Sequence, residues 1–73
     1  MKAFQIYRED IKKIVCKSIN ANDFEDAAAK YVSALMIVGM VKMSDSVCEL
    51  LQENIFKIKK TDGTYFQVTV TEI

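Results

Sequence analysis

The strongest nucleophiles in this sequence are two thiols, Cys16 and Cys48, and both lack the partners that thiol chemistry needs. A catalytic cysteine or serine is activated by a neighbouring base, most often histidine, and the 73-residue chain contains no histidine. Zinc usually takes four nitrogen or sulfur ligands, so two cysteines without a CxxC spacing do not complete a site. We therefore expect no enzyme activity, no metal and no cofactor. The thiols are expected to be reduced and buried, although a disulfide between them stays open.

The carboxylates favour a structural role over a catalytic one. Asp23, Glu25 and Asp26 follow one another closely in NDFED. These positions fit the first turn of a helix, where the helix dipole favours negative charge. Two-carboxylate hydrolysis needs acids that face each other across a cleft, and no such spacing stands out. The acidic cluster is therefore interpreted as a helix start and not as a cation site.

The side chains best suited to recognition are a group of lysines beside an aromatic residue. Lys57, Lys59 and Lys60 precede Tyr65 and Gln67 by a few residues. Tyrosine is a frequent anchor of protein–protein interfaces, so we predict that these five residues contact a partner. Ten basic residues balance ten acidic ones, giving zero formal net charge. A neutral domain lacks the electrostatic footprint of a nucleic-acid binder, so nucleic acid is the less favoured partner.

These recognition residues belong to a predicted β-hairpin, IFKIKKTDGTYFQVTVTEI, at residues 55–73. A two-residue loop would pair the apolar Ile58 with the polar Gln67. A three-residue loop at residues 61–63 instead pairs Ile58 with Phe66 and places Gly63 at the left-handed position. We predict this second register. Its buried face would consist of Phe56, Ile58, Phe66, Val68 and Val70, with Lys57, Lys59, Tyr65, Gln67, Thr69 and Thr71 on the other face.

A helix is predicted to begin at Asn22 or Asp23 and to continue through the apolar stretch YVSALMIVGMVKM, residues 31–43. Its core stripe is expected to contain Phe24, Ala28, Tyr31, Leu35 and Val38.

The second half of this helix is predicted to carry another apolar face, because apolar residues also occupy the side opposite the core stripe. Either a short second helix or a second copy of the chain would cover that face, so a homodimer stays open. The short helix would be capped by Ser44 or Ser46, carry Val47, Leu50 and Leu51, and end near Asn54. The residues of the candidate self-association face are Met36, Ile37, Met40 and Val41.

The N-terminal third decides between two folds. Residues 2–7 read as a strand, whereas residues 11–19 fit either a strand or a helix. A strand gives an α+β protein of order ββααββ, with two helices on one face of a small antiparallel sheet. A helix gives three helices followed by a hairpin, the order of a winged helix. We favour the strand, because β-branched residues are frequent there and the segment leads directly into a helix cap.

Length and hydropathy predict a single domain, residues 1–73, in the cytoplasm. The N-terminus lacks the apolar core of a signal peptide. The longest apolar stretch is shorter than the roughly 20 residues that cross a bilayer, so no membrane is expected as a partner.

Two segments together, SINANDFEDAAAKYV and FKIKKTDGTYFQVTV, resemble small ββαββ proteins of bacteriophages and mobile elements. Some anti-CRISPR proteins that block a CRISPR surveillance complex are built this way. The resemblance covers about half of the chain, and the apolar segment at residues 36–54 departs from it. It implies a small inhibitor that occupies the surface of a larger host protein or nucleoprotein complex. The alternative is a small winged-helix regulator that binds DNA.

Overall fold

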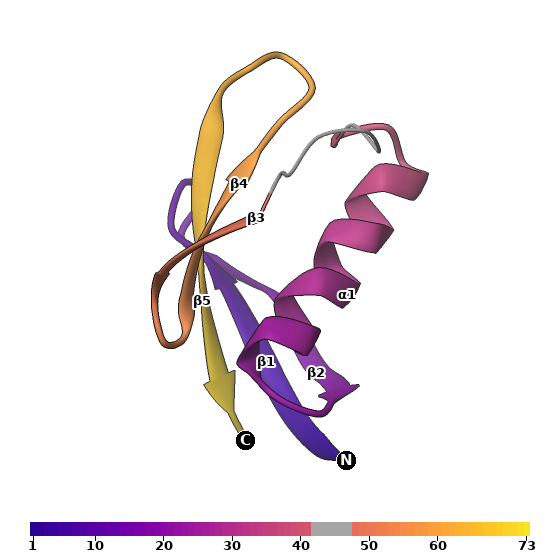
Figure 1. Cartoon of the computed structure of the whole chain (residues 1–73), viewed down its shortest axis with the longest axis vertical. Coiled ribbons are helices and arrows are strands. Elements are labelled where there is room, and N and C mark those ends of the chain that lie inside the picture. Colours follow the sequence, from indigo (N-terminus) through magenta and orange to yellow (C-terminus); the bar gives the residue numbers. More distant parts are fainter. Residues whose placement is uncertain (42–47) are drawn as a thin grey trace.

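The computed structural model describes residues 1–41 and 48–73 and has an α+β fold. Five strands form one antiparallel sheet in the order β2-β1-β5-β4-β3, and within the described residues one helix packs on one face of the sheet (Figure 1). No helix in those two ranges combines the length and the hydropathy needed to cross a bilayer. The elements are β1 (Lys2–Arg8), β2 (Lys13–Ala21), α1 (Phe24–Ile37), β3 (Cys48–Gln52), β4 (Ile55–Lys59) and β5 (Tyr65–Glu72).

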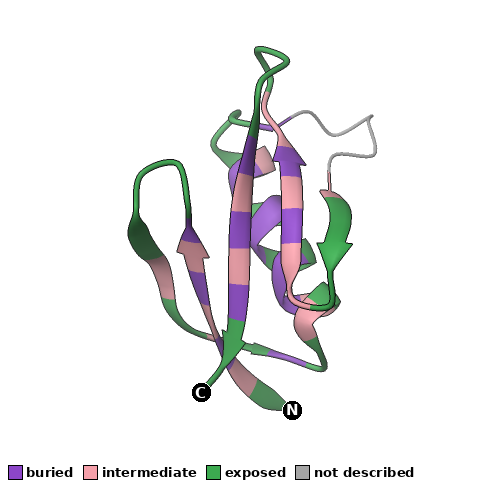
Figure 2. Cartoon of the chain, turned by 90° about the vertical axis from the view of Figure 1, so that its left-hand side faces the viewer, coloured by how far each residue is buried: buried purple, intermediate pink, exposed green. Residues whose placement is uncertain are grey.

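The predicted register of the C-terminal hairpin is confirmed. Strands β4 and β5 pair Ile58 with Phe66 and Phe56 with Val68. The Lys60 N–H donates to the Thr64 carbonyl at 2.7 Å, which leaves a three-residue loop at 61–63. The five side chains predicted to be buried are all buried, and they alternate with more exposed ones along both strands (Figure 2).

The loop of this hairpin requires a glycine at residue 63. Gly63 has φ +89°, a conformation that L side chains rarely adopt. We expect Gly63→Ala to lower the free energy of unfolding by about 1 kcal/mol, since the left-handed region is strained for alanine. Urea denaturation followed by circular dichroism measures this loss. A Cβ at this position meets no other atom within 4 Å, so backbone strain is the expected source of the loss. A stability equal to that of the wild type would contradict the strain argument.

The start of helix α1 also lies where the sequence placed it. Asp23 is the N-cap, and its carboxylate accepts a hydrogen bond from the Asp26 N–H at 2.8 Å. Asp26 in turn accepts from the Asn22 N–H at 2.9 Å. Lys30 lies 3.6 Å from the Asp26 carboxylate. Two of the three acids in the cluster are thus held by the helix start itself, as the interpretation of a cap requires.

The predicted length of this helix is wrong, because α1 ends at Ile37. The Met40 N–H donates to the Leu35 carbonyl at 2.9 Å and the Gly39 N–H to the Met36 carbonyl at 3.1 Å. Gly39 has φ +78°. This is the bond pattern of a Schellman motif with glycine at C′, which terminates a helix. Val38, expected in the core stripe, is the C-cap and is exposed.

The N-terminal segment forms a strand, which confirms the favoured alternative. Strand β2 pairs with β1 through Phe4–Ile19 and Ile6–Cys16. Irregularities on either side of Ile6 shift this register twice. Such bulges change which face successive residues occupy, and they account for the imperfect alternation of the sequence. The arrangement of three helices and a hairpin is therefore wrong.

The predicted second helix is also wrong where the structure describes its residues. Residues 48–52 form strand β3, which pairs Leu50 with Phe56 of β4. Asn54, expected as a helix stop, lies in the β3–β4 turn. Its side-chain amide donates to the Val70 carbonyl at 3.0 Å, and its backbone carbonyl accepts from the Val70 N–H at 2.8 Å. These bonds hold the turn against β5, and the two apolar runs on either side of the turn pair as strands β3 and β4. The expected caps Ser44 and Ser46, and Val47, lie outside the described residues.

The hydrophobic core lies between α1 and the sheet. The ring of Phe24 packs edge-on against Phe4 at a centroid distance of 5.5 Å. The Thr61 hydroxyl donates to the Gly39 carbonyl at 2.9 Å, tying the hairpin tip to the end of the helix. The core therefore consists of one layer between helix and sheet, and the opposite face of the sheet is left for other roles. The largest fully buried side chains of the core are Phe4, Ile6, Phe56, Ile58, Val68 and Val70.

Candidate binding surface

The face of the sheet that points away from α1 has no helix over it within the described residues (Figure 2). Side chains alternate between the two faces along each strand, so the residues between the buried ones point to this outer face. Most of these residues are polar. Strands β1, β5 and β4 meet side by side at the centre of this outer face. Its members on these three strands are Gln5, Tyr7, Ile55, Lys57, Lys59, Tyr65, Gln67, Thr69 and Thr71.

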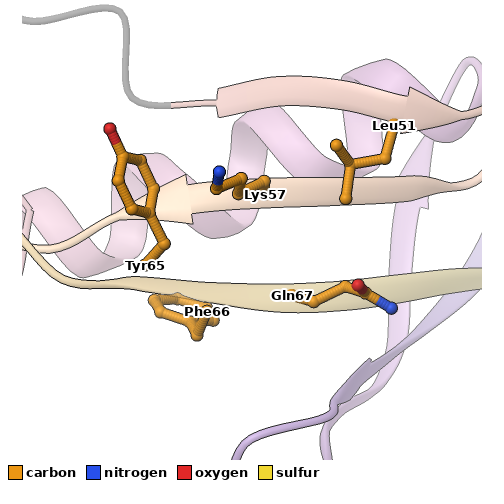
Figure 3. Close-up of a pocket in the computed structure, with 5 residues that line it drawn as sticks. All are labelled: Leu51, Lys57, Tyr65, Phe66 and Gln67. Carbon is orange, nitrogen blue, oxygen red and sulfur yellow. The ribbon is translucent and has the colours of Figure 1, made fainter.

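Four of the five predicted recognition residues lie on this outer face, and three of them meet at one depression. The Lys57 ammonium lies 4.3 Å from the centre of the Tyr65 ring, a cation–π contact. Together with Gln67 they line a shallow, open depression of about 360 Å³ (Figure 3). Leu51 of β3 closes one side of it. Tyr65 as a whole is 51% exposed, so its ring contacts Lys57 without being buried.

The other two recognition residues are separated from this depression. Lys59 pairs directly with Tyr65 and shares its face, but it does not line the hollow. Lys60 lines a different hollow at the hairpin tip, next to Met40, Thr61 and Asp62. The predicted group therefore divides into an outer-face set and one residue at the tip.

The surface predicted for self-association is not a single face. Val41 is only 3% exposed, because the turn at Gly39 directs it back into the core. Met36 is half-buried against the core, whereas Ile37 is 86% exposed and Met40 is 40% exposed. The prediction that grouped these four residues assumed that the helix continues beyond Ile37, whereas residues 38–41 are not helical.

A buried arginine is the feature that the sequence analysis missed. Arg8 follows Phe4 and Ile6 on the inner face of β1, so its guanidinium enters the core. It binds the Asp10 carboxylate through two nitrogens, at 3.0 and 2.6 Å, and lies 3.9 Å from the centre of the Phe66 ring. A third nitrogen donates to the Tyr31 hydroxyl at 3.4 Å. The signal was present in the alternation of β1, which directs position 8 inward.

This cluster shifts two ionisation equilibria. The hydrogen bonds from Arg8 hold the pKa of the Asp10 carboxyl below its usual value. The bond to Asp10 raises the pKa of Arg8. Both shifts stabilise the charged pair, and neither produces a group that exchanges protons near neutral pH. The cluster is therefore suited to structure and not to acid–base chemistry.

The two thiols lie apart from this cluster and are poorly activated. Burial raises the pKa of both Cys16 and Cys48, and the charge of Glu25 adds to the effect at Cys48. A raised pKa keeps a thiol protonated and weakly nucleophilic. Both cysteines are free. Within residues 1–41 and 48–73, no group of three histidine, cysteine, aspartate or glutamate side chains could hold a metal ion.

Comparison with known proteins adds no family to this description. Neither the family models nor the curated proteins nor the solved structures contain a match to the chain. The resemblance to small phage proteins therefore stays a prediction made from the sequence.

Proposed function

We propose that this protein is a non-enzymatic protein-binding module, and that its partner docks on the outer face of the sheet around Tyr65. The observation that carries the proposal is the exposed Lys57–Tyr65 contact beside Leu51 and Gln67. A half-exposed aromatic ring held by a neighbour loses little conformational freedom on binding, which is the property of an interface anchor.

Two features favour a protein partner over the alternatives. The formal charge is zero, and the depression is open, whereas a small-molecule site buries most of its ligand. The proposed mode of action is steric: the module occupies a surface that a host complex needs, as the resemblance to anti-CRISPR inhibitors of phages implies. Its place of action would be the cytoplasm of the host cell.

The test is an affinity measurement with a matched control. A partner is first isolated by affinity capture with the wild-type chain from lysate of the cell type that expresses it. We then expect Tyr65→Ala to weaken binding by about 30-fold, the effect of removing an interface anchor. Ile37→Ala removes another exposed apolar side chain, on the helix side of the fold, and should leave the affinity unchanged. An affinity that is insensitive to Tyr65→Ala, or that falls more with Ile37→Ala, would reject this surface.

A further inference from the structure

The two edges of the sheet are protected unequally. Strand β2 forms one edge and carries the exposed Lys13 and Lys17. Lysines on an edge strand discourage pairing with another chain. Strand β3 forms the other edge and contains no basic residue. Its Leu50 and Leu51 are 58% and 47% exposed. The β3 edge therefore lacks the lysines that the β2 edge carries.

A groove runs along β3 on the helix side. It has a volume of about 260 Å³, and its lining combines apolar groups of Ala29, Leu50 and Phe56 with Cys48 and Glu25. The charge of Glu25 reaches the groove, since it contributes to the raised pKa of Cys48. A side chain that enters from beyond β3 would thus meet an apolar floor with a negative charge at its rim.

The outer side of β3 also carries negative charge. Glu49 pairs with Lys57 in the β3–β4 register, but the Lys57 ammonium lies over the Tyr65 ring. Glu49 takes part in none of the ion pairs formed among the described residues. Glu53 follows directly in the turn. A strand added beyond β3 would find an acidic neighbour on this face.

We propose that the β3 edge accepts an extended peptide segment of a partner protein, with apolar and basic side chains in alternation. The backbone of the segment would extend the sheet by one strand, as in β-augmentation. Its apolar side chains would face the groove beside Leu50, and its basic side chains would lie next to Glu49. This site is distinct from the outer face around Tyr65, so it adds a second mode of recognition to the proposed function.

A second copy of the chain fits this edge less well than such a peptide. In antiparallel self-pairing of β3, each residue lies opposite another β3 residue. Because β3 contains no basic residue, no such register supplies a countercharge to Glu49. A register centred on Glu49 would place two carboxylates opposite each other, which is destabilising. A peptide with alternating apolar and basic side chains would supply apolar contacts on the groove side and a countercharge on the side of Glu49.

The probes for the test are three synthetic peptides with blocked ends. KVKVKVK has lysine on one face and valine on the other when extended, EVEVEVE reverses its charge, and KVKPKVK keeps its basic charge but lacks a backbone donor at its centre. Each is titrated into ¹⁵N-labelled protein while amide chemical shifts are recorded. With wild type we expect shifts centred on residues 48–52, and about fivefold tighter binding of KVKVKVK than of EVEVEVE, near the upper limit for one cross-strand charge pair.

Variants at Glu49 make the test specific. Glu49→Lys should invert the preference between the two charged peptides. Glu49→Gln removes the charge without adding repulsion against Lys57, and it should reduce the preference, because Glu25 and Glu53 remain nearby. Failure of this site and failure of the outer-face proposal can be told apart, because the peptide titration reports on residues 48–52 and the Tyr65→Ala affinity measurement reports on the outer face. The proposal is overturned if KVKPKVK binds as well as KVKVKVK, if the shifts centre elsewhere, or if Glu49→Lys keeps the wild-type preference. Concentration-dependent dimerisation in sedimentation that perturbs the same amides would also overturn it, because a second copy would then occupy the edge.

Discussion

Replacing Phe56 by alanine is expected to leave at least about half of the protein unfolded at 25 °C. Phe56 is 1% exposed and is among the largest fully buried side chains. Removing a buried phenylalanine ring costs about 3–5 kcal/mol. A single core in a chain of this size supplies a total stability of about 3–5 kcal/mol. The loss therefore equals or exceeds the whole stability of the fold, and circular dichroism in the absence of denaturant should show at most about half of the native signal.

Two further variants keep this first prediction measurable. Ile58→Val removes one buried methyl group and should lower the free energy of unfolding by about 1 kcal/mol, which urea denaturation can resolve. Ile55→Ala changes the neighbouring, half-buried residue on the outer face and should cost less than Phe56→Ala. A Phe56→Ala protein as stable as Ile55→Ala would show that the core does not lie between α1 and the face of the sheet that carries Phe56.

The second large effect is expected from the Arg8–Asp10 pair. Asp10→Ala removes the main partner of a guanidinium whose side chain is only 9% exposed. Breaking a fully buried pair costs about 3–5 kcal/mol because a charge is left without compensation. Asp10 is partly open to solvent, so we expect a smaller loss of about 1–3 kcal/mol. Urea denaturation at pH 7 measures the difference from wild type.

The pH dependence of this loss identifies its cause. Hydrogen bonds from Arg8 lower the pKa of Asp10 in the folded state. The resulting stabilisation is fully present above the unfolded pKa of about 3.9 and is lost as the pH falls through the lower folded value. The stability difference between wild type and Asp10→Ala should thus be constant from pH 7 to about pH 5 and shrink below about pH 4. A difference that does not change down to pH 2 would assign the loss to packing and not to charge.

The sequence predicts the parts of this fold that depend on neighbouring residues. The β4–β5 register follows from the alternation of apolar residues around Gly63, since a slip of one residue would exchange the two faces. The start of α1 follows from Asp23 and the acids after it. Local patterns also brought Lys57, Tyr65 and Gln67 together, because cross-strand neighbours are determined once a hairpin register is known.

The segment from Met36 to Asn54 could not be predicted in the same way. Short apolar runs such as VCELL fit a buried helix and a strand equally well, and pairing with β4 makes residues 48–52 a strand. The end of α1 did have a local signal in Gly39 at a C′ position. Leu51 joins the candidate surface only through the β3–β4 pairing, so its role could not be seen before the sheet was known.

The most direct test of the outer-face proposal is site-specific photo-cross-linking to the partner. Gln67→p-benzoylphenylalanine places the reactive group on the outer face, and Ala34→p-benzoylphenylalanine places it on the exposed side of α1. With the partner isolated by affinity capture, position 67 should give a cross-linked adduct of defined mass and position 34 should not. Cross-linking from position 34 with none from position 67 would show that the partner binds the helix side, and it would contradict the assignment of the outer face as the binding surface.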